Sequence, residues 1–206
     1  MASALLSIYR MPKANFFFVF LGLFLLPVLN IGQASERNII VSVPEQRLVV
    51  FDNGLRVAQY PISTSKFGLG DRPRSYATPL GTLQIASKIG HGVPAGTVFK
   101  GCRPTGEVLR PNSPGRDPIV TRILRLRGLE SSNSRAYARG IYIHGTPVER
   151  AIGRRASYGC IRMKSRDVVE VFQTVPVGTR VEIINAPLSR ALREVAATRR
   201  NGLGAS

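Results

Sequence analysis

The feature that most constrains the fold is a succession of short β-branched runs separated by turn-forming residues. NIIVSV (38–43) and QRLVVF (46–51) are followed by DNG (52–54), a strong signal for a tight hairpin. LRVAQYPIS (55–63) then follows as the returning arm. Further strands are expected at 78–87, 95–101, 118–126, 140–145 and 179–184. The sequence therefore predicts a mostly β single domain over residues 38–185.

One helix is expected inside this domain, in SRDVVEVFQTV (165–175). Its valines and Phe172 form an apolar stripe at helical spacing. Ser165 is placed to cap the N-terminus, and Asp167 lies in the first turn, where the helix dipole favours a carboxylate. We therefore expect this helix to begin just after Ser165 and to pack one face on the sheet.

A long segment rich in Pro, Gly and Arg, residues 102–117, shows no periodicity and is predicted to be a loop. Loops of this length inside compact domains are more often functional than accidental. The whole stretch from His91 to Asp117 is expected to form either a lid or acceptor groove, or a surface insertion without a catalytic role.

The N-terminus differs from the rest of the chain. Arg10 and Lys13 precede the uninterrupted apolar block 16–29, and NIGQAS supplies small residues of the kind that a signal peptidase requires. This order predicts a secretory signal peptide over residues 1–34, with an uncleaved N-terminal anchor as the alternative. Either form would place the domain outside the cytoplasm, in a periplasm or cell envelope.

The chain is strongly basic, with 29 Lys and Arg against 12 Asp and Glu and a formal charge of +17. Such a charge is typical of proteins with polyanionic partners. For an exported protein, these would be cell-wall polymers, anionic lipids or carboxylate-bearing peptides, and a solvated surface without a partner is the alternative. Residues 186–206 form a basic C-terminal tail, either a helix against the domain or membrane or a surface appendage.

His144 and Cys160 stand sixteen positions apart, each beside a glycine, in a chain with two histidines and two cysteines. The pair fits a thiol catalyst, half of a metal site, half of a disulfide, or no functional relation. Zinc is disfavoured because neither Cys-x-x-Cys nor His-x-x-x-His spacing occurs, and we expect no metal. A bridge between Cys102 and Cys160 is possible by count.

A cysteine that attacks an acyl carbon requires an exposed turn, a nearby base and donors for the oxyanion. Ser157 and Gly159 permit a tight bend at Cys160, whose N–H and that of Gly159 are candidate oxyanion donors. His144, at the end of a predicted strand, could draw the thiol proton. No carboxylate lies close in sequence to orient the imidazole, so the carbonyl of Gly145 is the simplest candidate.

IHGT, followed by SYGCIRM and then by Asp167 seven residues after Cys160, resembles the L,D-transpeptidase catalytic (YkuD-like) domain family. The resemblance extends over nearly all of residues 38–185. It implies a β-sandwich or barrel-like catalytic domain with one or two short helices, and no cofactor. The other matching segments are RLVVFDNGLRVAQYPIS, TPLGTLQI and VGTRVEII.

The resemblance also implies roles for individual residues. Cys160 would be the nucleophile, His144 the general base, and Gly145 the residue whose carbonyl orients that base. The remaining motif positions, expected at the substrate, are Ser157, Tyr158, Gly159 and Arg162.

Three of these expectations carry alternatives. Arg162 would either meet a carboxylate of the substrate with its planar fork or only brace the loop. Tyr158 stands where many family members carry a second histidine, which puts that residue's help at the oxyanion in doubt. If Cys160 is the nucleophile, Cys102 should remain a free thiol.

The implied activity is peptidoglycan L,D-transpeptidation, in cell-wall biosynthesis and organisation. The thiolate would attack the bond between the diamino acid and D-alanine of a tetrapeptide stem, and release D-alanine. An amine of a neighbouring stem or of a lipoprotein would then resolve the thioester. Water in its place would make the chain an L,D-carboxypeptidase or hydrolase.

Two hypotheses from other classes are weaker. A non-catalytic wall-binding domain would not need the intact Cys160 and His144 pair. A nucleic-acid or lipid binder would need aromatic residues interleaved with basic ones, and we expect no nucleic-acid partner. Tyr137 and Tyr142 lie near arginines in the sequence, and tryptophan is absent. Membrane association would follow only from an uncleaved N-terminus.

Overall fold

The strands follow the β-branched runs of the sequence. The structure, a computed structural model, describes residues 36–193, and the expectations for residues 1–34 and for the end of the tail lie outside them. The elements are β1 (Arg37–Ser42), β2 (Arg47–Asp52), β3 (Leu55–Pro61), β4 (Gly81–Ile89), β5 (Thr97–Lys100), β6 (Arg103–Val108), β7 (Ile119–Gly128), a 3-10 turn (Ser131–Asn133), β8 (Tyr142–Gly145), a second 3-10 turn (Glu149–Ala151), β9 (Ile161–Met163), α1 (Ser165–Thr174) and β10 (Arg180–Ile184).

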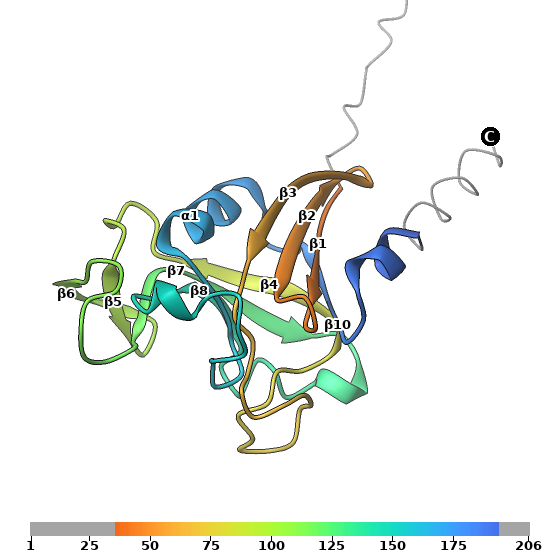
Figure 1. Cartoon of the computed structure of the whole chain (residues 1–206), viewed down its shortest axis with the longest axis horizontal. Coiled ribbons are helices and arrows are strands. Elements are labelled where there is room, and N and C mark those ends of the chain that lie inside the picture. The colour runs from red at the N-terminus through yellow and green to blue at the C-terminus, as the bar shows by residue number, and fades with distance from the viewer. Residues whose placement is uncertain (1–35, 194–206) are drawn as a thin grey trace, which may run out of the picture. The chain divides into compact units, whose positions relative to one another are not determined.

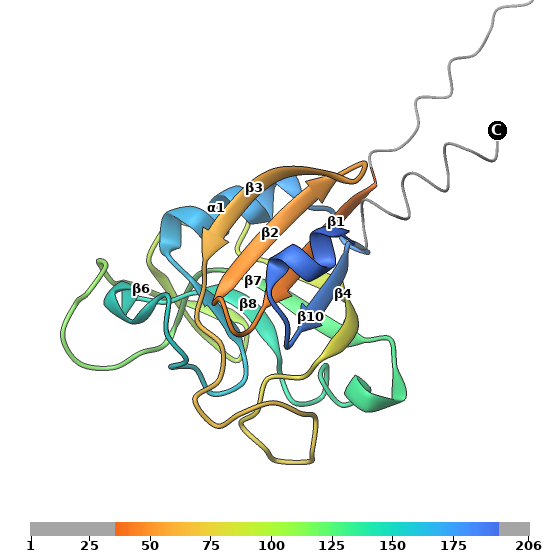
Figure 2. The same cartoon turned by 45° about the vertical axis from the view of Figure 1, so that its right-hand side comes forward.

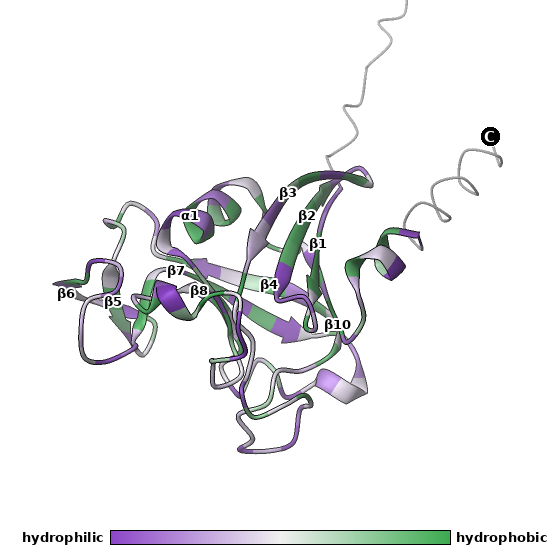
Figure 3. Cartoon of the chain, viewed as in Figure 1, coloured by the Kyte–Doolittle hydropathy of each residue, from purple (hydrophilic) through white to green (hydrophobic). Residues whose placement is uncertain are grey.

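These strands form one mixed sheet in the order β3-β2-β1-β10-β4-β7-β5-β6, with β8 paired to β7 and β9 (Figures 1 and 2). β1 runs parallel to β10 and β8 parallel to β9, while the other pairs are antiparallel. α1 packs against β7 and β8 and buries Val168, Val171 and Phe172 in the main core. Figure 3 shows the apolar residues concentrated on strands such as β2, with polar residues in the connecting loops. The mostly β prediction is confirmed.

The predicted DNG hairpin is present between β2 and β3. Asn53 and Gly54 both have positive φ, 49° and 74°, which is the backbone of a type I′ turn. This turn matches the right-handed twist of the two strands it joins. The DNG sequence therefore correctly predicted the turn between β2 and β3.

Two sequence expectations differ from the structure. Part of the expected 102–117 loop is β6, which pairs with β5, and all six of its residues are exposed, so no apolar alternation marked it. The α1 N-cap is Lys164, and Ser165 is the first helical residue. The Ser165 hydroxyl is instead 2.8 Å from the Thr121 hydroxyl on β7, so it ties the helix start to the sheet.

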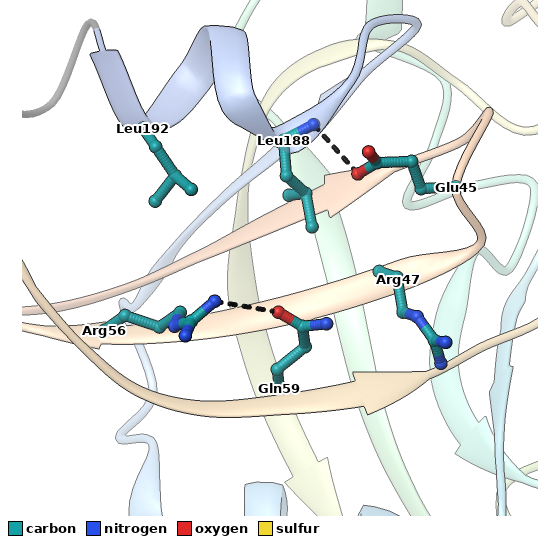
Figure 4. Close-up of a pocket in the computed structure, with 6 residues that line it drawn as sticks. All are labelled: Glu45, Arg47, Arg56, Gln59, Leu188 and Leu192. Carbon is teal, nitrogen blue, oxygen red and sulfur yellow. Dashed lines mark hydrogen bonds between the residues drawn. The ribbon is translucent and has the colours of Figure 1, made fainter.

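The start of the basic tail packs on the outer side of β1 and β2. Residues 188–193 are helical, and Leu188 and Ala191 join a second apolar cluster with Ile40, Val49 and Phe51. The Leu188 N–H donates to Glu45 Oε2 at 2.9 Å (Figure 4). A shallow groove between this segment and β2–β3 is lined by Glu45, Arg47, Arg56, Gln59, Leu188 and Leu192. Within residues 36–193, no helix is long and apolar enough to cross a membrane.

A buried ion pair joins the β3–β4 loop to the segment that enters β8. Arg139 Nη1 lies 2.5 Å from Asp71 Oδ1, and the two side chains are 8% and 3% exposed. Asp71 Oδ2 also accepts the Arg135 N–H at 2.6 Å. The Arg139 guanidinium donates further to the carbonyl oxygens of Gly70, Ser75 and Ala77.

Removing one partner of this buried pair should be strongly destabilising. Arg139→Met leaves the Asp71 carboxylate buried without its cation, a change that costs about 3–5 kcal/mol in comparable pairs. The matched control is Arg116→Met, which removes an exposed pair with Glu107 and should cost at most about 1 kcal/mol. Urea unfolding followed by circular dichroism measures both, and equal losses would contradict the assignment.

Candidate active site

The register of β8 and β9 brings the predicted catalytic residues together. Ile143 pairs with Ile161, and His144 pairs with Arg162. Because side chains alternate along a strand, the two buried isoleucines point into the main core and His144 and Arg162 point to the other face. Cys160 directly precedes Ile161 and so belongs to the face of His144. A pocket of about 190 Å³ opens there, lined by Asp117, Ile119, His144, Ser157, Tyr158, Cys160 and Arg162.

The imidazole of His144 is held by its own strand. His144 Nδ1 lies 2.8 Å from the Gly145 carbonyl oxygen, the contact expected from the sequence. Since a carbonyl only accepts, Nδ1 carries the proton and Nε2 is left with its lone pair. Burial lowers the pKa of His144 to about 4, although the Gly145 carbonyl opposes this shift. The histidine is therefore a neutral base at pH 7.

Residue 145 is glycine because β7 approaches it closely. A Cβ at Gly145 would lie 2.7 Å from the Val120 carbonyl oxygen and 3.0 Å from Thr121 Cβ. Val120 is also its cross-strand partner. The close approach holds the Gly145 backbone, and with it the carbonyl that orients His144, against a rigid strand.

The Cys160 thiol is partly buried and protonated at rest. Its Sγ donates to the Gly140 carbonyl at 3.3 Å. Burial raises the pKa of Cys160 to about 11, while the Tyr142 N–H and the charge of Arg139 lower it in part. The pocket therefore holds a neutral thiol and a neutral imidazole at pH 7.

Ser157 and Gly159 shape the turn that presents Cys160. The Ser157 hydroxyl donates to the Cys160 carbonyl at 2.6 Å and accepts the Gly159 N–H at 3.2 Å. Gly159 has φ +116°, and a Cβ there would lie 3.1 Å from Ile141 Cδ1. The Gly159 N–H, expected from the sequence as an oxyanion donor, is thus engaged by Ser157.

The β3–β4 loop fastens this turn from outside. Thr78 Oγ1 donates to the Gly159 carbonyl at 3.0 Å, and the Lys66 N–H donates to the Ser157 carbonyl at 3.1 Å. The Ser157 N–H donates in turn to the Thr64 carbonyl at 2.9 Å. Three separate hydrogen bonds therefore tie the Cys160 turn to a loop about 80–90 residues earlier in the chain.

Tyr158 forms the rim of the pocket and is 57% exposed. Its ring centroid lies 5.3 Å from Phe67 and 5.6 Å from Tyr76, and Lys66 Nζ is 3.2 Å from its hydroxyl. The ammonium of Lys66 also lies 4.5 Å from the Tyr158 ring centroid. Phe67 and Tyr76 were missed in the sequence because they lie in a polar loop without periodicity.

Arg162 already has a carboxylate partner. Its Nη1 pairs with Asp117 Oδ2, and Asp117 Oδ1 accepts the Thr146 hydroxyl at 2.5 Å. The Arg162 side chain is 6% exposed, and burial lowers the pKa of Arg162. Asp117, also missed as a site residue, ends the 102–117 segment and becomes part of the pocket wall through these two contacts.

The remaining cysteine and histidine lie apart from the pocket lining. Cys102 and Cys160 are both free thiols, and Cys102 Sγ donates to the Tyr142 hydroxyl at 3.5 Å. His91 packs its ring against Phe172, with centroids 4.6 Å apart. Within the described part of the chain, no group of three or more His, Cys, Asp or Glu residues is placed to hold a metal ion.

The sequence matches a known protein family. Residues 36–183 match the family described as the L,D-transpeptidase catalytic domain. One relative, named probable L,D-transpeptidase ErfK/SrfK, from Escherichia coli (strain K12), is 32% identical over 74% of this chain and 46% of its own length. A second from the same strain, named probable L,D-transpeptidase YbiS, is 31% identical over 78% of this chain and 51% of its own length. The chain thus spans about half the length of these curated relatives.

Among solved structures, an L,D-transpeptidase from Mycobacterium smegmatis aligns with a TM-score of 0.48 and 18% identity, over 73% of this chain and 59% of that one. The family match covers more than two thirds of the 206 residues. On that match, the chain belongs to the L,D-transpeptidase catalytic domain family.

Proposed function

We propose that this protein is a peptidoglycan L,D-transpeptidase that acts on the peptide stems of the wall. The observation that carries the proposal is the pocket that Cys160 and His144 line together. In it, the Gly145 carbonyl fixes the histidine tautomer so that Nε2 is left to accept a proton. Cys160 is the nucleophile, His144 the base and Gly145 the orienting residue in this proposal.

The first half-reaction forms a thioester and releases D-alanine. The Cys160 thiol passes its proton to His144 Nε2 as Sγ attacks the carbonyl carbon between the diamino acid and D-alanine. The Tyr142 N–H, which meets Sγ, stabilises the thiolate as it forms. Collapse of the tetrahedral intermediate breaks the C–N bond, and the imidazolium returns the proton to the leaving amine.

The second half-reaction transfers the acyl group to an amine. The acceptor amine attacks the thioester carbonyl, gives up a proton to His144, and the C–S bond breaks. The imidazolium then reprotonates the sulfur, which restores the neutral pair. The acceptor is a second stem in this proposal, with a lipoprotein amine as the alternative, and water in its place would give a carboxypeptidase.

Four further residues have proposed roles at the substrate. Tyr158, on the exposed rim, contacts the stem, while Ser157 and Gly159 keep the Cys160 turn in the shape that lets a carbonyl approach. Arg162 is proposed to complete the side of the pocket, where it pairs with Asp117. These four residues lie on β9 and on the tight turn before it, so their spacing is set before substrate binds.

The cellular setting is also a proposal. Residues 1–34 have the charge and apolar pattern of a signal peptide or anchor, which would deliver the catalytic domain, residues 38–185, to the periplasm or cell envelope. The formal charge of +17 suits a wall polymer rich in carboxylates. The basic tail, residues 186–206, adds to that charge, and membrane association would require an uncleaved N-terminus.

Substituting either member of the catalytic pair should abolish crosslinking. The parent protein, given a disaccharide-tetrapeptide, should yield a crosslinked dimer lacking one D-alanine, and Cys160→Ala and His144→Ala should yield none, at least about 10³-fold below the parent. Mass spectrometry of the products measures this. The matched control is His91→Gln, which should keep activity because the His91 ring packs on Phe172, away from the pocket lining.

Other products would change the assignment. Tripeptide without dimer would mean that water resolves the thioester, so the protein would be a carboxypeptidase. Unchanged tetrapeptide with a folded parent would contradict the proposed function. Dimer formation by Cys160→Ala would remove this cysteine from the mechanism.

The acid limb of the pH profile should lie well below the ordinary histidine pKa. Burial lowers the pKa of His144 to about 4, so the base stays neutral as pH falls through 6.5 and is lost only near pH 4. The measurement is kcat/KM for D-alanine release between pH 4 and 8, with circular dichroism at each pH to detect unfolding. An acid limb near pH 6.5 in a folded enzyme would contradict the buried, neutral base, and His91→Gln should leave the limb in place.

A further inference from the structure

The sheet face that carries the pocket continues beyond it across β8 and β7. Tyr142 lies two residues before His144 on β8 and therefore points to the same face. Its cross-strand partner on β7 is Arg125, which shares that face because directly paired residues do. The side chains of Tyr142 and Arg125 thus form the next part of the surface that a substrate bound at Cys160 would meet.

Arg125 is held between two aromatic rings. Its guanidinium carbon lies 4.2 Å from the Tyr137 ring centroid and 5.8 Å from that of Tyr142. The Tyr142 hydroxyl is itself fixed by Cys102 at 3.5 Å. Aromatic faces hold a guanidinium in place without using its N–H groups, so its donors stay available for an anion.

Arg125 lacks the partner that the other arginines near Cys160 have. Arg139 pairs with Asp71, and Arg162 pairs with Asp117. Within residues 36–193, Arg125 makes no ion pair, which sets it apart from Arg139 and Arg162; the buried Nε atoms of all three lack a hydrogen-bond partner. A half-buried guanidinium with unfilled donors is costly unless something completes it, and a planar carboxylate matches its fork.

The position of Arg125 relative to the nucleophile indicates which carboxylate fits. The Tyr142 N–H donates to Cys160 Sγ, and Arg125 lies one strand away from Tyr142, about 4.8 Å between backbones. A carboxylate one residue beyond the attacked carbonyl lies about 3.5 Å further along an extended peptide. The leaving residue of the donor stem carries its free C-terminal carboxylate one residue from the attacked carbonyl, and the Arg125 side chain extends from the strand next to Tyr142.

We propose that Arg125, flanked by Tyr137 and Tyr142, is the subsite that binds the terminal carboxylate of the residue released from the donor stem. The inference rests on the proposed function and makes it more specific. It assigns to Arg125 the selection of stems that end one residue after the scissile bond, because a longer stem would carry its carboxylate past the guanidinium.

The test compares a tetrapeptide stem with the same peptide bearing a C-terminal amide. The rate of release of the terminal residue, as kcat/KM, is measured by mass spectrometry for the full-length parent, Arg125→Gln and Arg125→Lys. The parent should prefer the acid by about 10- to 100-fold, the range of a charge-assisted hydrogen bond. Arg125→Gln should lose most of that preference, and Arg125→Lys should keep part of it because the charge remains.

The ratio of acid to amide separates recognition from general damage, since a poorly folded variant loses both rates together. The matched control is Arg127→Gln. Arg127 lies on β7, like Arg125, and its guanidinium carbon is 5.1 Å from the Tyr137 ring centroid. It lies two residues beyond Arg125, the partner of Tyr142, so the parent ratio of acid to amide should persist. A parent ratio near one, or an unchanged ratio in Arg125→Gln, would overturn the subsite and leave the proposed function standing. A folded parent that releases nothing from either peptide would overturn both.

Discussion

The parallel pairing of β8 with β9 is the interaction on which the site depends. It sets Ile143 and Ile161 side by side in the core, and that burial fixes which residues face outward. A slip of one residue would place His144 among the apolar side chains and expose an isoleucine in its stead. The hydrophobic register thus secures the catalytic geometry, and the hydrogen bonds around the Cys160 turn refine it.

Two arginines near the pocket are paired with carboxylates, Arg139 with Asp71 and Arg162 with Asp117. The charge of Arg139 still lowers the pKa of Cys160 in part, but burial has the larger effect. Burial in such surroundings keeps His144 uncharged and Cys160 protonated, with pKa values of about 4 and about 11. In the proposed mechanism, charge separates only when the Cys160 proton passes to His144 as the thiol attacks a substrate carbonyl.

Local patterns predicted the strands with apolar alternation, the DNG hairpin and the position of α1, because each is decided by residues close in sequence. β6 was not predicted because all of its residues are exposed, so no apolar alternation marks it. β9 was not predicted because it is only three residues long. The motif also named Cys160 and His144, which line one pocket, and Gly145, whose carbonyl contacts His144 Nδ1. Asp117, Phe67 and Tyr76 were not foreseen, because their contacts with the pocket depend on loops whose paths no spacing rule determines.

The parallel pairing of β1 with β10 joins the two ends of the domain. Asn38 and Arg180, about 140 residues apart, are neighbours at the centre of the sheet. β1 therefore cannot complete its pairing until β10 is in place, and contacts between strands so far apart in sequence form slowly. In a chain synthesised from its N-terminus, β1 would lack its inner neighbour until β10 was made, so the sheet could not be completed before nearly the whole domain had been synthesised.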